Sequence, residues 1–533
     1  MTLITQAPLT VPLGSGGVTP EDVLAVARHD AKVTISPEAL DDVAKVRSHI
    51  DELADSEVPA YGISTGFGAL ANRHIPKELR AQLQKSLIRS HAAGMGPAVE
   101  REVVRGILFL RARTLASGRT GVRPVVLQTM VDVLNAGITP VVREFGSLGC
   151  SGDLAPLSHC ALVLMGEGEA AGPDGTLYGG SRTKGGPAVA ELLAEHGIAP
   201  VTLAEKEGLA LVNGTEGMLG MLLMAIADIR QLLTTADITA ALSVEALLGT
   251  DQVFLPELHA ALRPHPGQAA SAENMLRVLS NSPMVASHRV NDTRVQDAYS
   301  LRCAPQVAGA VRDTVDHAAL VASRELAAAI DNPVVLPDGR VSSNGNFHGA
   351  PVAYVLDFLA IAVADLSSIA ERRTDRMLDP ARSHGLPAFL AADPGVDSGL
   401  MIAQYTQAAL VSDNKRLAVP ASVDSIPSSA MQEDHVSMGW HAARKLRRAV
   451  ENLRRVLAIE LVASARALDI RTQLSGGELT PGPAGAAVIR ALRAVVEGPG
   501  PDRFLAPELE AAERLIAAGG VRAAAESTVG KLA

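Results

Sequence analysis

The chain of 533 residues contains few cysteines and few aromatic residues. Its three cysteines, Cys150, Cys160 and Cys303, form neither a CxxC pair nor a Cys/His spacing typical of zinc sites. An odd number of thiols without such spacing disfavours a disulfide framework and indicates a reducing cytoplasm. Aromatic residues make up only 3% of the chain, with a single tryptophan. Because β-sandwich strands favour aromatic and β-branched residues, we expect a mainly helical protein.

Positive net charge and long uncharged apolar runs are also missing. The formal net charge is −10 at pH 7, so we expect no electrostatic attraction to nucleic acid or to an anionic membrane. The apolar stretches 208–229 and 352–369 are interrupted by Glu216 and Asp357, and neither provides the roughly 20 uncharged residues of a membrane span. Residues 1–17 lack a basic segment followed by an apolar one, so no signal peptide is expected. The sequence therefore predicts a soluble, cytoplasmic protein.

Helix boundaries are clearly marked in the first part of the chain. Thr19 and Ser36 are each followed by proline and then by acidic residues, which is the pattern of a helix start. Further helices are expected over 102–117 and 123–136, because a glycine follows each of them.

From about residue 202 onward the predicted helices become longer. They cover 303–330, 352–377 and 429–471, and the last would span ~60 Å at 1.5 Å per residue. Helices of this length are typical of an extended bundle. The glycine-rich stretch 172–187 and the segment 475–502 are expected to form loops or linkers.

A run of basic residues lies inside the predicted helix 429–471. We expect these side chains to form a solvated or intersubunit face paired with acidic groups, because the acidic chain disfavours nucleic-acid binding. The run consists of Arg444, Lys445, Arg447, Arg448, Arg454 and Arg455.

Most common catalytic motifs are missing. There is no GxxxxGK[ST] loop, no HExxH and no pair of histidines four residues apart on a helix. Ser151 lies in the sequence GCSGD, which fails the GxSxG pattern because Asp153 replaces the second glycine. Cys150 lacks a protease or redox signature, so acyl transfer through Ser151 or Cys150 is disfavoured.

The sequence GSLGCSGDLAPLSH at residues 146–159 closely resembles the signature of the aromatic amino acid lyases. In that family an Xaa-Ser-Gly tripeptide cyclises to 4-methylideneimidazole-5-one (MIO). The resemblance implies that the Gly152 nitrogen attacks the carbonyl two residues back, an approach that a missing side chain permits. Ser151 then loses water across Cα–Cβ, which leaves an electrophilic methylidene. Cys150, in place of the commoner alanine, would supply only backbone, so no role is expected for its thiol.

A helix is expected just beyond the tripeptide, as Asp153 and Pro156 indicate. The dipole at the start of that helix would favour negative charge developing on the ring.

Six further blocks resemble the same family and occur in its order along the chain. They lie at residues 61–68, 90–94, 207–215, 296–303, 343–349 and 431–438. The resemblance extends over about residues 14–520 and is strongest to histidine ammonia-lyases of the actinobacterial kind. It implies conversion of L-histidine to trans-urocanate and ammonia by an autocatalytically formed MIO, without an external cofactor or an obligatory metal.

The resemblance also implies a fold and an assembly. The fold would be mainly α, an elongated central helical bundle of the fumarase/aspartase/ammonia-lyase type with a smaller N-terminal domain. That domain, with the tyrosine loop and the MIO-forming segment, would occupy residues 1–200, and the long-helix bundle with the C-terminal helices would occupy 201–533. A homotetramer is expected in which each active site draws on three subunits.

Catalytic roles follow residue by residue from the matching blocks. Tyr61 would be the base that removes the β-proton, and because a phenol has a pKa of ~10 the site would have to stabilise phenolate. Arg302 would bind the substrate carboxylate with its two-pronged guanidinium. Tyr299 and Asn213 would orient the amine and the MIO oxygen. The full set of predicted site residues is Tyr61, His91, Asn213, Gln296, Tyr299, Arg302, Phe347 and Glu433, together with Cys150, Ser151 and Gly152.

Substrate specificity is predicted from His91 and Glu433. A Ser-His pair at the selectivity position resembles the histidine lyases, although some tyrosine aminomutases share it. A carboxylate at position 433 suits an imidazole N–H or imidazolium, whereas other aromatic lyases and aminomutases of the family usually have glutamine. Without this block, Glu433 would be interpreted as part of a helix salt bridge.

Three alternatives stay open at this point. The first is a tyrosine or phenylalanine ammonia-lyase or a 2,3-aminomutase of the same family. The second is a non-catalytic helical scaffold, which the intact Cys150-Ser151-Gly152 disfavours. The third is a fumarase/aspartase-type enzyme, which the missing GSxxMPxKxN segment disfavours.

Overall fold

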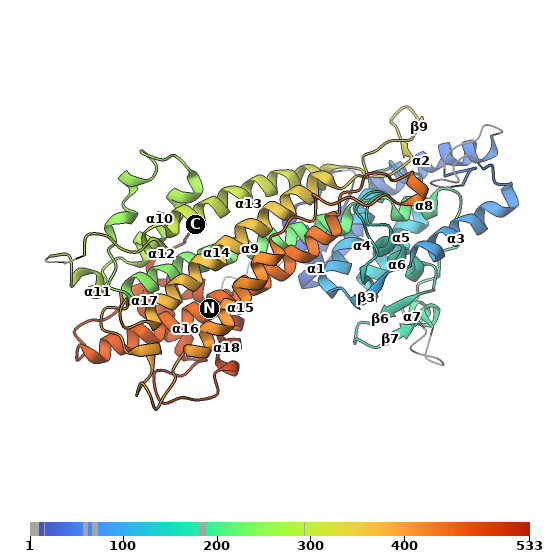
Figure 1. The fold of residues 1–533 in the computed structure, drawn as a ribbon. Coiled ribbons are helices and arrows are strands. Elements are labelled where there is room, and N and C mark those ends of the chain that lie inside the picture. The colour runs from blue at the N-terminus through green and yellow to red at the C-terminus, as the bar shows by residue number, and fades with distance from the viewer. Residues whose placement is uncertain are drawn as a thin grey trace.

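The computed structural model describes residues 10–14, 16–56, 62–66, 73–180, 188–290, 292 and 294–533. The molecule is mainly helical and elongated, with its longest helices running between two ends that carry shorter elements (Figure 1). The predicted fold class is confirmed: the centre of the molecule is a bundle of long helices.

Five long helices build this bundle. Helix α16 packs along α14, α9 and α15, and α13 packs against α14 and α9. At 1.5 Å per residue the 36-residue α16 is about 54 Å long. Their bounds are α9 (Glu216–Ala246), α13 (Ala304–Ala327), α14 (Ala350–Leu378), α15 (Met401–Leu417) and α16 (Gly439–Leu474).

The expected helices over 303–330 and 352–377 are confirmed as α13 and α14, but the prediction of a helix over 429–471 is wrong at its start. The helix begins only at Gly439, and the preceding backbone has positive φ angles at Ala430 (52°) and Met438 (54°). A β-bridge between Ser428 and Glu433 holds this stretch away from helical geometry. Contact with a distant part of the chain also contributes, because the Met438 amide donates to the carbonyl of Leu148.

A second correction concerns the segment 475–502, which was expected to be a loop or linker. It contains helix α17 (Pro483–Arg493), whose apolar residues are buried. It packs against α19 (Gly520–Val529) and α10 (Pro266–Val278). The other helices at this end of the bundle are α11 (Pro283–Ala286), α12 (Tyr299–Arg302) and α18 (Ala506–Ala517). Short 3-10 turns occur at Lys77–Leu79, Gln252–Phe254, Pro256–Leu258, Ala388–Leu390 and Ser429–Met431.

The opposite end of the molecule carries the N-terminal helices (Figure 1). The predicted helix starts are confirmed, since the Thr19 and Ser36 hydroxyls accept hydrogen bonds from the Asp22 and Ala39 amides. The helices are α1 (Pro20–His29), α2 (Pro37–Asp55), α3 (Arg80–His91), α4 (Arg101–Ala116), α5 (Pro124–Asn135), α6 (Leu154–Leu164), α7 (Val189–Glu195) and α8 (Glu207–Val212). Gly118 and Gly137 follow α4 and α5 with φ of 64° and 76°, as expected of left-handed helix ends.

The described strands are short and form four small sheets. Strands β1 (Thr10–Leu13) and β2 (Lys32–Ile35) pair in parallel, with Thr10 opposite Lys32. The others pair antiparallel: β3 (Met95–Ala98) with β5 (Arg143–Phe145), β6 (Glu169–Ala171) with both β4 (Thr139–Pro140) and β7 (Leu177–Gly179), and β8 (Val334–Val335) with β9 (Val341–Ser342). Strand β5 leads directly into residue 146, where the predicted MIO segment begins.

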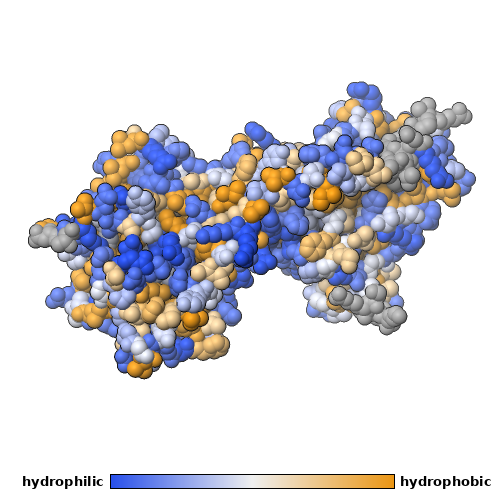
Figure 2. Space-filling view, viewed as in Figure 1, coloured by the Kyte–Doolittle hydropathy of each residue, from blue (hydrophilic) through white to orange (hydrophobic). Residues whose placement is uncertain are grey.

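The bundle helices are apolar and largely buried. Two helical stretches, Glu207–Ala246 and Ala350–Leu378, are long and apolar enough to cross a membrane, but the apolar window of the first is entirely buried inside the protein and that of the second is 61% buried. Helix α14 keeps Tyr354, Phe358 and Ile361 exposed. Figure 2 shows apolar residues gathered over the middle of the bundle on the face in view.

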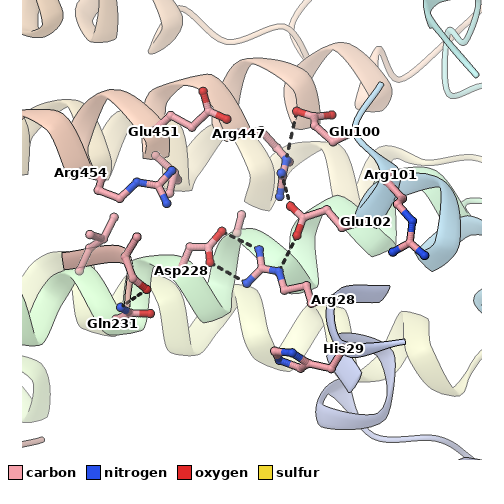
Figure 3. A pocket seen from close by; sticks show the side chains of 14 residues that line it. Arg28, His29, Glu100, Arg101, Glu102, Asp228, Gln231, Arg447, Glu451 and Arg454 are labelled. Carbon is pink, nitrogen blue, oxygen red and sulfur yellow. Dashed lines mark hydrogen bonds and ion pairs between the residues drawn. The ribbon is translucent and has the colours of Figure 1, made fainter. Parts of the chain in front are cut away.

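A charged cavity of about 690 Å³ lies where the N-terminal helices meet the bundle (Figure 3). Arg28 of α1 pairs with Glu102 of α4 at 2.7 Å and with Asp228 of α9 at 2.7 Å, and Arg447 of α16 also binds Glu102. The predicted basic run therefore pairs with acidic groups of its own chain. This cavity contains none of the predicted site residues, and its ion pairs join α1 and α4 to α9 and α16.

Candidate active site

The predicted tripeptide lies in a tight turn between β5 and α6. Gly152 has φ of 80°, and a Cβ placed on it would lie 2.2 Å from the carbonyl oxygen of Gly214. The Asp153 amide donates a hydrogen bond to that same oxygen at 2.7 Å. Both the left-handed backbone and the close approach of Gly214 require glycine at position 152.

Segments from two other parts of the chain hold the start of this turn. The carbonyl of Leu148 accepts a hydrogen bond from the Met438 amide at 2.8 Å. The carbonyl of Gly149 accepts two, from the Ser437 hydroxyl at 2.6 Å and from the Gly349 amide at 3.0 Å. The turn is thus fixed by residues about 200 and 290 positions further along the chain, which the sequence-derived roles did not include.

Asp153 connects the turn to the bundle. Its carboxylate accepts hydrogen bonds from the Ser147 hydroxyl (2.8 Å) and from the amides of Gly217 (2.9 Å) and Met218 (3.0 Å) in the first turn of α9. The side chain is fully buried, and this burial raises the pKa of Asp153 to about 7. The predicted helix start after Asp153 is confirmed, since α6 begins at Leu154, but the carboxylate binds α9 rather than α6.

Glu433 lies directly against the tripeptide. One of its oxygens, Oε1, accepts a hydrogen bond from the Ser151 hydroxyl at 2.9 Å. The other oxygen, Oε2, accepts hydrogen bonds from the Cys150 thiol at 3.3 Å and from the Ser428 hydroxyl at 3.0 Å. Glu433 precedes α16 and lies outside any helix, so the helix salt bridge considered as an alternative is not formed.

The Cys150 thiol has a partner that the sequence did not indicate. Cys150 is buried, and this burial, with the nearby Glu433 charge, raises the pKa of its thiol to about 12. The thiol therefore stays protonated near neutral pH and donates to the carboxylate. Cys160 and Cys303 are free thiols as well.

His91 is the last residue of α3 and is half-buried. Its Nδ1 lies 3.0 Å from the Ser90 hydroxyl oxygen. Burial lowers the pKa of His91, although the negative charge of the nearby Glu433 acts in the opposite direction. Burial therefore favours the neutral form of the imidazole, and Glu433 is close enough to oppose this shift.

Asn213 lies between α8 and α9, next to the Gly214 that contacts Gly152. Its side-chain amide donates to the carbonyl of Asn332 at 3.0 Å, and its backbone carbonyl accepts from Arg111 at 3.1 Å. Arg111 is completely buried and pairs with Glu216 at 2.8 Å. One feature of the sequence indicated this buried ion pair, because Glu216 interrupts an apolar stretch.

Phe347 is half-buried in the loop between β9 and α14. The neighbouring Gly349 contacts Gly149, and His348 lies 3.2 Å from the carbonyl oxygen of His435. The loop therefore lies against the start of the tripeptide turn and against the segment that contains His435.

The remaining described site residues lie elsewhere. Tyr299 and Arg302 belong to α12 and Gln296 lies just before it, at the end of the molecule opposite α3, α6 and α8 (Figure 1). Helix α13 begins directly after α12, and its 24 residues extend about 36 Å toward the end that carries Asn213. Tyr299 is 71% exposed, and the Arg302 guanidinium lies 4.7 Å from the centre of its ring. One chain therefore does not bring these three residues to the tripeptide.

Tyr61, the predicted base, lies outside the described residues.

Comparison with known proteins agrees with this architecture. The sequence model for aromatic amino acid lyases matches residues 18–494. A histidine ammonia-lyase from Streptomyces griseus is 69% identical over 98% of this chain and 100% of its own length. Among solved structures, a tyrosine aminomutase from Streptomyces globisporus matches with a TM-score of 0.89 at 37% identity, over 97% of this chain and 99% of that one. Histidine ammonia-lyase from Trypanosoma cruzi matches with a TM-score of 0.87 at 37% identity, over 97% and 95% of the two chains. The match to the family over most of the chain, together with a relative that aligns along its whole length, places this chain in the aromatic amino acid lyase family.

Proposed function

We propose that the chain is a cytoplasmic histidine ammonia-lyase that converts L-histidine to trans-urocanate and ammonia. The observation that carries this proposal is the contact between the Glu433 carboxylate and the Cys150-Ser151 segment. An imidazole N–H is a good partner for a carboxylate, whereas the phenyl ring of phenylalanine offers no hydrogen-bond donor. The 69% identity to a histidine ammonia-lyase supports the same substrate.

The reaction must remove ammonia, a poor leaving group, and a weakly acidic β-proton. We propose that Cys150, Ser151 and Gly152 form MIO, which supplies an electrophile for the substrate amine. The residues fit this group, because Gly152 has the left-handed backbone and the close contact with Gly214 that exclude a side chain. Hydrogen bonds to Leu148 and Gly149 hold the turn from outside.

The side chains around the tripeptide would bind and orient the substrate. Glu433 would accept the imidazole N–H of histidine, and the neutral His91 would contribute a second polar group on the same side. Asn213 would orient the amine, since its segment already contacts Gly152 through Gly214. Phe347 would form part of the pocket wall.

The far end of the chain carries the groups for the rest of the substrate. Arg302 would bind the carboxylate in a bidentate manner, Tyr299 would orient the amine and the MIO oxygen together with Asn213, and Gln296 would complete the pocket. We propose that these groups reach the tripeptide of another subunit in a homotetramer, because α13 separates the two ends within one chain. Tyr61 would act as the base that removes the β-proton.

A tyrosine aminomutase activity is the second candidate, and the TM-score of 0.89 to such an enzyme favours it. Assays of histidine, tyrosine and phenylalanine side by side distinguish the candidates. We expect urocanate absorbance with histidine and little product from the other two amino acids, and its absence with histidine would refute the main proposal.

The Glu433→Gln variant tests the specificity argument directly. A hydrogen bond to a charged acceptor contributes about 1.5–3 kcal/mol, so kcat/KM for histidine should fall roughly 10- to 100-fold. Any turnover of tyrosine should fall much less. Unchanged kinetics with histidine would remove Glu433 from substrate recognition. Glu478, an exposed carboxylate that follows α16 at the end of the bundle away from the tripeptide, provides the matched control as Glu478→Gln.

A further inference from the structure

The two oxygens of the Glu433 carboxylate have unequal surroundings. Oε1 accepts one hydrogen bond, from the Ser151 hydroxyl at 2.9 Å. Oε2 accepts two, from the Cys150 thiol at 3.3 Å and from the Ser428 hydroxyl at 3.0 Å. The donors thus divide into a serine on one oxygen and a thiol with a second serine on the other.

Only one of these donors is lost if the proposed cofactor forms. Ser151 loses its hydroxyl oxygen as water, together with its Cα hydrogen, so the donor to Oε1 disappears. The side chains of Cys150 and Ser428 take no part in that dehydration and stay available to Oε2. Maturation would therefore free one oxygen of Glu433 and leave the other one occupied.

We propose that the Cys150 thiol is a positioning residue that, with Ser428, holds Oε2 of Glu433 so that Oε1 is presented to the imidazole N–H of the substrate. This inference rests on the proposed function and deepens it. It gives the first residue of the tripeptide a side-chain role in specificity in addition to its backbone role.

The surroundings of Cys150 suit this role. The side chain is only 6% exposed, so its position is set by packing rather than by solvent. Because burial and the adjacent carboxylate keep the thiol protonated, it donates a hydrogen bond and does not repel Glu433. The Ser428–Glu433 β-bridge fixes the backbone on the other side of the carboxylate. An alanine at position 150 would leave Oε2 with one side-chain donor, and the carboxylate would gain rotational freedom.

The test compares Cys150→Ala, which removes the donor, with Cys150→Ser, which keeps one. Cys160→Ala is the matched control, since the pKa of this buried thiol is raised by burial alone. Intact mass first establishes that each purified variant has lost two waters. KM and kcat for L-histidine and the inhibition constant of trans-urocanate, which carries the same imidazole, are then measured.

We expect Cys150→Ala to raise KM and the inhibition constant roughly three- to tenfold, because a thiol is a weak donor, while kcat changes by less than about threefold. Cys150→Ser and Cys160→Ala should stay within about twofold of the wild type. Wild-type constants in matured Cys150→Ala would overturn the proposal. An equal loss in Cys150→Ser would also overturn it, because packing rather than the donor would then matter.

A second measurement does not depend on maturation of the alanine variant or on turnover. The infrared S–H stretch of Cys150 is identified as the band lost in Cys150→Ser. It should lie at a lower frequency than the stretch of a thiol without a hydrogen bond, and it should move to higher frequency in Glu433→Gln. A band that is insensitive to Glu433→Gln would overturn the proposal. If the wild type does not turn over histidine at all, the proposed function fails, while the infrared result still decides whether Cys150 donates to Glu433.

Discussion

The two ends of the molecule carry the predicted site residues in very different states. At one end the turn that carries Cys150-Ser151-Gly152 is held by segments near residues 214, 349 and 437, and the Cys150 thiol and the Ser151 hydroxyl both donate to Glu433. At the other end Tyr299 and Gln296 are exposed, and a buried Nε atom of Arg302 has no partner among the described residues. The described residues of one chain hold the turn at the first end from several sides, whereas the second end presents polar groups outward.

This difference separates two requirements of the proposed enzyme. Formation of the proposed cofactor needs a tight turn that is held from several sides, and the described residues of one chain hold such a turn. Binding of the substrate needs groups from both ends, and these are kept about 36 Å apart by the length of α13. Variants at the tripeptide end should therefore lose cofactor formation, whereas variants at the α12 end should lose substrate binding.

The largest effect is expected at the tripeptide itself. Ser151→Ala has no hydroxyl to lose, so the second dehydration is impossible and kcat should fall by at least roughly a thousandfold. Intact mass and the rate of urocanate formation measure the two consequences. Ser158→Ala, in the adjoining helix α6, is the control and should mature normally. Substantial activity in Ser151→Ala would place the electrophile elsewhere.

The next largest effect is expected at the opposite end. Arg302→Ala removes the proposed carboxylate partner, and kcat/KM for histidine should fall roughly 100-fold. Unlike Ser151→Ala, this variant should lose two waters like the wild type, because α12 does not contact the tripeptide. Arg289→Ala, an exposed arginine of the same end, should leave kcat/KM unchanged. Loss of maturation in Arg302→Ala would contradict the separation of the two ends.

Assemblies that contain both variants should recover part of the activity. When Ser151→Ala and Arg302→Ala chains are co-expressed, sites that combine the intact end of each should reach up to about a quarter of wild-type activity under random assembly. Each variant alone provides the background, and light scattering reports the size of the assembly. No gain above the two backgrounds would show that the ends do not come from different chains.

The smallest effect concerns two buried carboxyl groups, one at each end. Burial raises the pKa of both Asp153 and Glu245 to about 7. Because these folded-state values exceed the unfolded ones, the stabilisation is present at low pH and is lost as the pH rises through 7. Between pH 6 and 8 each group should cost about 1.4 kcal/mol, a decrease in Tm of roughly 1 °C.

Asp153→Asn and Glu245→Gln should each flatten this pH dependence in scanning calorimetry. Only Asp153→Asn should also reduce the fraction of chains that lose two waters, since only Asp153 contacts the tripeptide turn and α9. An unchanged pH profile in both variants would mean that neither carboxyl titrates near neutral pH.

The sequence predicted the bundle well because helix signals are local. Proline at a helix start, glycine after a helix end and apolar spacing along 352–377 depend on neighbouring residues, and the structure confirms them. The irregular stretch 429–438 was missed because its geometry depends on the Ser428–Glu433 bridge and on Leu148, which is 290 residues away from Met438.

The prediction of the site also succeeded for features carried by local sequence blocks and failed for contacts between distant residues. The family blocks indicated which residues to consider, and Glu433 does contact Ser151. The supporting residues Asp153, Ser437 and Arg111 were not predicted as site residues, because each has a partner that lies at least 64 positions away: Gly217, Gly149 and Ala210, respectively. The contact of the Cys150 thiol with Glu433 was not predicted either, since the first residue of the tripeptide was expected to matter only through its backbone.

The close approach of Gly152 to Gly214 has a consequence for protein design. Three consecutive residues carry the groups needed for the proposed ring formation, but they do not specify the geometry that supports it. Transplanting Cys-Ser-Gly into a loop of another helical protein would omit the carbonyl of Gly214, the amide of Gly349 and the hydroxyl of Ser437. A designer would have to graft four separate backbone segments in register, so the smallest transferable unit is a three-dimensional junction rather than a sequence motif.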